Sequence, residues 1–168
     1  MATTSYAIAL GSNRRHVRHG GPEGVLRAAV VAIAELGDVD RVSAIHRTPA
    51  LGPAGRSFAN AALLLATDLS PLDLLAAMKR TERHFGRRPG RRWGPRVLDL
   101  DIILWSEGIY RAPRLAIPHS EMAKRAFVLR PLAEIAPDWR DPLSGRTVRQ
   151  LAARFIRASA VDRKSART

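Results

Sequence analysis

The chain has 168 residues, of which 46% are hydrophobic, and this length and composition indicate one folded domain rather than a disordered chain. It contains no cysteine, which excludes disulfides and thiolate metal sites, and no apolar run close to the ~20 residues of a membrane-spanning helix. Because the N-terminus also lacks a signal pattern, we expect a soluble protein of the cytoplasm.

The formal net charge of +13 favours an anionic partner, such as nucleic acid, a nucleotide or anionic lipid. The positive charge gathers in two places, a loop over residues 87–96 and the C-terminal end of the chain. We expect a single domain over residues 1–157 and a basic, disordered tail over residues 158–168, because no apolar periodicity follows Ile156. An arginine-rich host proteome could also produce such a tail without any function.

The first half of the chain alternates between strand and helix patterns. Residues 6–10 form a short β-type apolar run, and from Pro22 apolar residues recur every three or four positions up to Gly37, which predicts an amphipathic helix. Residues 39–47 alternate as in a strand. Residues 58–69 predict another strand, antiparallel to the preceding one.

A second helix is expected from Ser70, with Pro71 in the first helical position, to about residue 85. Glu82 lies on the apolar stripe of this helix, so its carboxylate needs a partner. That partner is either Lys79 or a loop arginine in an ion pair, or a bound ligand. The position of Glu82 alone favours the ion pair.

The strand expected over residues 98–105 carries Asp99 and Asp101 two positions apart. Because side chains alternate along a strand, both carboxylates project from one face, where they repel each other unless a positive group lies between them. That group is either a divalent metal such as magnesium, which binds carboxylates and phosphates, or the neighbouring arginines in a structural cluster.

The last part of the chain predicts short helical pieces near residues 121–125 and 127–135 and a final helix over residues 147–156. The complete order is βαββαβ with additions. It predicts an α+β protein with a ferredoxin-like core, a mainly antiparallel sheet with helices on its faces in an α/β/α sandwich.

Common nucleotide and zinc motifs are missing from the sequence, including the Gly-x-x-x-x-Gly-Lys phosphate loop and a His pair at zincin spacing. The acidic pair behind an arginine-rich loop remains, and it fits phosphoryl-type transfer. The stretch from Arg92 to Ile103 (RWGPRVLDLDII) resembles the signature of the 6-hydroxymethyl-7,8-dihydropterin pyrophosphokinase family. Further matches follow in the family's order between residues 6 and 151.

The resemblance implies transfer of pyrophosphate from ATP to the hydroxymethyl group of the pterin, with AMP leaving, in folate biosynthesis. It implies two magnesium ions bound by Asp99 and Asp101, and a catalytic set made of Arg87, Arg92, Arg96, Asp99 and Asp101. The residues that match positions around ATP are Glu82, Arg92, Trp93, Arg96, Ile102, Arg114, His119 and Arg125.

For the pterin, the resemblance implies that Phe58 and Phe127 stack on the two faces of its ring and that polar groups hydrogen-bond to its amide edge. The full set that matches pterin-binding positions is Thr48, Pro49, Leu51, Phe58, Asn60, Asp99 and Phe127. Position 58 is Phe where some members have Tyr, which keeps the stacking face.

The competing hypothesis is a basic module that binds RNA or DNA through the arginine loop and the tail. It fits the charge, but Asp99 and Asp101 would oppose a phosphate backbone, and aromatic residues make up only 5% of the chain. We therefore expect small-molecule substrates, no nucleic acid and no membrane as partners, and a monomer.

Overall fold

The computed structural model describes residues 2–48, 56–86 and 97–165, with side chains described up to residue 156. One sheet contains β1 (Thr4–Ser12), β2 (Asp38–Val42), β3 (His46–Thr48), β4 (Phe58–Thr67) and β5 (Asp99–Trp105). The strands lie in the order β2-β4-β1-β5, β3 pairs with β4 beyond the end of β2, and all these pairs are antiparallel. The expected ferredoxin-like α+β fold is thereby confirmed.

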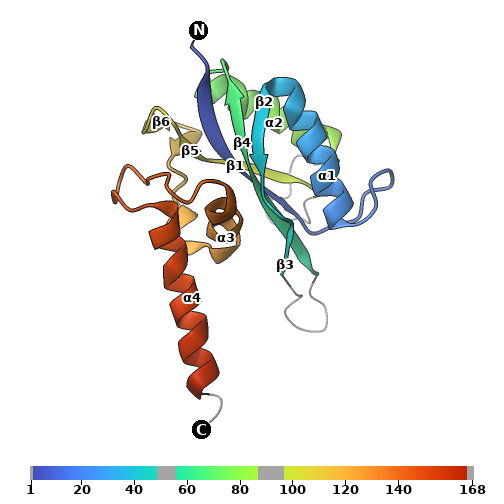
Figure 1. Cartoon of the computed structure of the whole chain (residues 1–168). Helices are drawn as coiled ribbons and strands as arrows, with labels where there is room; N and C mark the ends of the chain where they lie inside the picture. The colour runs from blue at the N-terminus through green and yellow to red at the C-terminus, as the bar shows by residue number, and fades with distance from the viewer. Residues whose placement is uncertain (1, 49–55, 87–96, 166–168) are drawn as a thin grey trace.

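Helices cover both faces of the sheet (Figure 1). α1 (Pro22–Ile33) and α2 (Pro71–His84) pack on one face, and α3 (Ala126–Ile135) packs on the other. α4 (Val148–Ser165) begins against α3 and then runs away from the sheet (Figure 1). A separate hairpin of β6 (Tyr110–Ala112) and β7 (Leu115–Ile117) follows β5.

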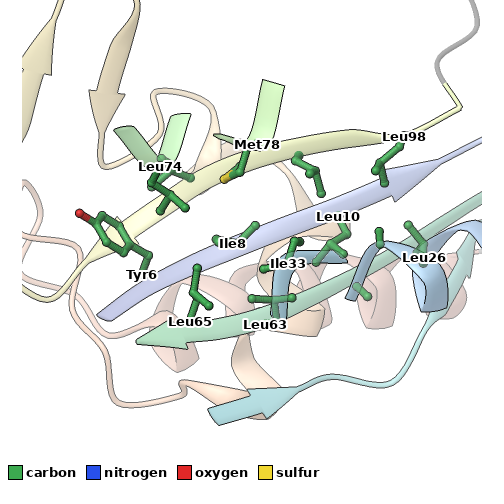
Figure 2. Close-up of a cluster of buried hydrophobic side chains, with 14 of the residues drawn as sticks. Tyr6, Ile8, Leu10, Leu26, Ile33, Leu63, Leu65, Leu74, Met78 and Leu98 are labelled. Atoms are coloured by element: carbon green, nitrogen blue, oxygen red, sulfur yellow. The ribbon is translucent and has the colours of Figure 1, made fainter. Parts of the chain in front are cut away.

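The core lies in two layers because side chains on a strand alternate between its faces. Figure 2 shows the larger layer, where Ile8, Leu10 and Leu63 from the central strands meet side chains of α1 and α2. The neighbouring positions, such as Ala7 and Leu64, face α3 and α4. The central strands are therefore covered on both sides.

Local signals place the second helix and the turn before β2. The Ser70 hydroxyl accepts a hydrogen bond from the Asp73 amide at 3.2 Å, which confirms the expected N-cap of α2. Gly37, which the sequence predicts as a helix cap, follows a 3-10 turn over Ala34–Leu36. A Cβ atom on Gly37 would lie 2.3 Å from the carbonyl oxygen of Ala66, so glycine permits this close approach.

The structure differs from the expected elements in three places. β1 continues through Gly11, which pairs with both β4 and β5, to Ser12, which pairs with β4. The strand expected over residues 39–47 is broken at residues 43–45 into β2 and β3. α4 continues past Ile156 to Ser165, so the stretch predicted as a disordered tail contains helical backbone up to that residue.

Across residues 2–48, 56–86 and 97–165, no helix combines the length and the apolar character needed to span a membrane.

Candidate active site

Asp99 and Asp101 lie on the sheet face that carries α3, as the alternation of β5 predicts. Gly11 of β1 is opposite Asp99, and Asn60 of β4 is opposite Gly11 from the other side. Asn60 and Asp99 are therefore two strand spacings apart, roughly 10 Å. A Cβ atom on Gly11 would be 3.2 Å from the Asn60 side-chain oxygen, so the Asn60 amide leans over the glycine.

The electrostatics of the aspartate pair favour a bound cation. Burial raises the pKa of Asp101, and the charge of Asp99 raises this pKa further, whereas His119 and Lys79 lower it. Because the net shift is upward, the positive groups nearby do not fully compensate the charge of Asp101. An additional cation between the carboxylates would favour the ionised form.

The donor atoms suit magnesium, which prefers oxygen ligands and keeps waters and substrate phosphates in its coordination shell. In the part of the chain that the structure describes, no group of three or more His, Cys, Asp or Glu side chains could hold a metal ion. Asp99 and Asp101 supply carboxylate oxygens that such an ion would need, and water or substrate oxygens would complete its shell.

Glu82 on α2 fixes the backbone between the two aspartates. Its carboxylate accepts a hydrogen bond from the Leu100 amide at 2.9 Å and forms an ion pair with Lys79 at 3.1 Å. The Glu82 side chain is fully buried. The ion pair is one of the two partners that the sequence leaves open, and contact between Glu82 and ATP stays a prediction.

His119 lies beside Asp101 because its own backbone is tied to β5. The His119 amide donates to the Ile103 carbonyl at 3.0 Å, and the ring Nε2 is 3.8 Å from Asp101 Oδ1. The ring Nδ1 accepts from the Glu121 amide at 3.2 Å. In a neutral ring the proton is therefore on Nε2, the nitrogen that faces Asp101.

A cavity of about 370 Å³ lies next to Asp101 and His119, between α2, β5 and the β6–β7 hairpin. Its lining includes four of the residues predicted for ATP or metal binding, namely Asp101, Ile102, Arg114 and His119. The volume lies within the range of small-molecule sites, about 300–1,000 Å³. The cavity therefore brings the predicted nucleotide residues of β5 and the hairpin together.

Four of the residues predicted for the pterin lie on β3, β4 and α3, namely Thr48, Phe58, Asn60 and Phe127. Thr48 pairs with Phe58, and Asn60 lies two residues further along the same face of β4. Phe58 and Phe127 are 47% and 46% exposed, so neither ring is taken up by the core. The Arg125 guanidinium lies over the Phe127 ring, 5.7 Å from its centroid, and links a predicted ATP residue to a predicted pterin residue.

Six of the predicted site residues lie outside the described residues: Arg87, Arg92, Trp93, Arg96, Pro49 and Leu51.

Sequence reasoning gives Lys79 only as a possible partner of Glu82, although Lys79 lines the cavity and lowers the pKa of Asp101. Its position three residues before Glu82 on one helix was the available signal. Ser120, to which the sequence assigns no role, also lines the cavity. No local pattern marks it, because the loop after β7 is brought to β5 only by tertiary packing.

The family model for 7,8-dihydro-6-hydroxymethylpterin-pyrophosphokinase matches residues 7–137. A relative from Synechocystis, named 2-amino-4-hydroxy-6-hydroxymethyldihydropteridine pyrophosphokinase, is 46% identical over 71% of this chain, and the match spans 64% of the relative's length. A relative of the same name from Pseudomonas aeruginosa is 44% identical, with 87% of this chain and 88% of the relative covered.

Among solved structures, the HPPK-DHPS protein of Plasmodium falciparum superposes with a TM-score of 0.68 at 12% identity. The superposition covers 92% of this chain and 44% of that longer one, and at this identity it supports the fold alone. The family match and the sequence relatives go further. The chain belongs to the 7,8-dihydro-6-hydroxymethylpterin-pyrophosphokinase family.

Proposed function

We propose that this chain transfers the pyrophosphoryl group of ATP to the hydroxymethyl oxygen of 6-hydroxymethyl-7,8-dihydropterin, giving the pterin diphosphate and AMP in folate biosynthesis. The observation that carries the proposal is the position of the Asp99 and Asp101 pair. Asp101 lines the cavity of about 370 Å³, and Asp99 lies across β1 from Asn60. Its family, whose members are pyrophosphokinases, gives the reaction class.

In this reaction the hydroxymethyl oxygen forms a bond to the β-phosphorus of ATP. The bond from that phosphorus to the oxygen that bridges to the α-phosphorus breaks, so AMP leaves, and the hydroxyl proton is released to solvent. Asp99 and Asp101 would hold two magnesium ions, the number that the family resemblance implies. Bound magnesium supplies charge neutralisation at the phosphate oxygens.

The other side chains bind and orient the two substrates. Arg114 and His119, at the cavity, would hold the nucleotide, and the Asn60 amide would read the polar edge of the pterin. The exposed rings of Phe58 and Phe127 would stack on the flat heterocycle. Since catalysis of phosphoryl transfer consists mainly of positioning and charge stabilisation, no further nucleophile is required of the protein.

Release of AMP from ATP tests the proposal, measured with and without the pterin, in magnesium and in EDTA. AMP that forms only with pterin and magnesium together would support it. Intact ATP in every mixture of folded protein would refute the enzyme assignment. A salt-sensitive, magnesium-independent affinity for nucleic acid would then favour the competing hypothesis.

We also propose that the protein acts as a monomer in the cytoplasm, where ATP is supplied. Light scattering during size-exclusion chromatography tests the oligomeric state.

A further inference from the structure

Within the residues that the structure describes, β3 is a three-residue strand whose only partner in the sheet is β4. Its pairs are His46 with Asn60 and Thr48 with Phe58, so it forms one ladder with three residues of the proposed pterin site. The break at residues 43–45 precedes it, so β3 is not a continuation of β2. A strand this short with one neighbour opens easily unless tertiary contacts hold it.

On the face that carries α3, Glu134 supplies such contacts. Its Oε1 pairs with the ring Nε2 of His46, and its Oε2 accepts from the Ala44 amide at 2.9 Å. The Ala44 amide lies in the break, where the regular ladder is interrupted. Glu134 is in the last turn of α3, where the helix dipole disfavours a carboxylate, so the stability of α3 itself does not explain it.

On the opposite face, Glu23 in the first turn of α1 pairs with the guanidinium of Arg47. His46 and Arg47 are consecutive on a strand, so their side chains point to opposite faces. Arg47 lowers the pKa of Glu23, as expected for a carboxylate that is stabilised in its ionised form. Glu134 of α3 and Glu23 of α1 therefore contact β3 and the residues just before it from opposite faces of the sheet.

We propose that Glu134 and Glu23 are positioning residues that hold β3 in its ladder with β4 and so set the affinity of the site for the pterin. The inference rests on the proposed function, because Thr48, Phe58 and Asn60 matter here as pterin contacts. The cavity proposed for ATP involves β5, at the opposite edge of the sheet from β3. Loosening β3 should therefore weaken pterin binding and spare the nucleotide.

The experiment compares Glu134→Ala, Glu23→Ala and the double variant with the full-length protein. We expect the KM for the pterin to rise about tenfold in the double variant, which corresponds to about 1.4 kcal/mol. The KM for ATP and kcat should stay within about twofold, a split that general destabilisation would not produce. Asp138→Asn, which breaks an exposed 3.1 Å ion pair with Arg149, is the matched control and should change neither KM.

Two further measurements address β3 directly. Amide hydrogen exchange in a peptide over residues 44–48 should become faster in the glutamate variants and remain unchanged in Asp138→Asn. Exchanging the charges, with Glu23→Arg combined with Arg47→Glu, should restore much of the pterin affinity that Glu23→Arg alone loses.

The possible outcomes separate this inference from the proposed function. Wild-type protein that neither binds the pterin nor forms AMP would overturn both. Active wild-type protein with unchanged pterin KM in the double variant would overturn only the role of the glutamates. Faster exchange at residues 44–48 without a change in pterin affinity would also overturn it, because β3 would then not set binding.

Discussion

At the scale of single residues, Asp101 is placed where its charge is unfavourable without a cation. Burial and the neighbouring Asp99 both raise its pKa, and His119 only partly offsets them. We predict that Asp101→Asn lowers turnover at least about a hundredfold, because the site loses a magnesium ligand. The same change should raise the melting temperature of the ligand-free protein, because it removes a buried charge that lies next to Asp99.

AMP release and thermal unfolding in EDTA measure the two effects of Asp101→Asn. Asp138→Asn, at a side chain that is 82% exposed, serves as the control for removal of one negative charge. A variant that lost both activity and stability would contradict the prediction, since Asp101 would then contribute to the fold.

At the scale of elements, Glu82 joins α2 to β5 through the Leu100 amide and pairs with Lys79 of its own helix. We predict that Glu82→Leu costs about 2 kcal/mol of unfolding free energy, because it leaves a backbone donor without this acceptor. Glu82→Gln should cost only about 1 kcal/mol, because its amide oxygen can still accept from Leu100. Urea unfolding measures the free energy of both variants, and Glu107→Gln, at an exposed side chain, is the control. Equal losses of unfolding free energy in Glu82→Leu and Glu82→Gln would contradict this account.

The link between α1 and β3 gives a prediction for pH. The hydrogen bond from Arg47 lowers the pKa of Glu23 below its ordinary value of 4.5, so the ionised carboxylate stabilises the folded state. This contribution is present above the unfolded pKa and is lost as the pH falls through the lower, folded pKa. The difference in unfolding free energy between wild type and Glu23→Gln should therefore be largest near neutral pH and shrink as the pH falls below 4.5. A pH-independent difference would contradict it.

The elements that sequence reasoning predicts well are those with local signals. α2 follows from its cap at Ser70, and the shared face of Asp99 and Asp101 follows from strand alternation alone. The break between β2 and β3 could not be predicted, because its Ala44 amide is satisfied by Glu134, 90 residues further along the chain. The cavity could not be predicted either, because it forms only where α2, β5 and the β6–β7 hairpin, which are separate in the sequence, pack together.

At the scale of the whole molecule, the sheet and the helices on its faces position the site, whereas the second half of α4 extends beyond that packing (Figure 1). α4 contributes Val148, Leu151 and Ala152 to the core layer under α3, and Phe155 packs against it. These contacts lie in the first part of the helix. The remaining part carries much of the terminal positive charge.

We therefore predict that truncation after Ile156 changes the melting temperature by no more than about 2 °C and leaves pterin-dependent AMP release unchanged. Leu151→Ala, which removes a fully packed side chain from the same helix, should cost about 2–4 kcal/mol of unfolding free energy. Thermal unfolding and AMP release test both variants. If truncation instead reduced turnover while the fold persisted, the basic end would take part in the reaction, because its charge would then act on the phosphates of ATP.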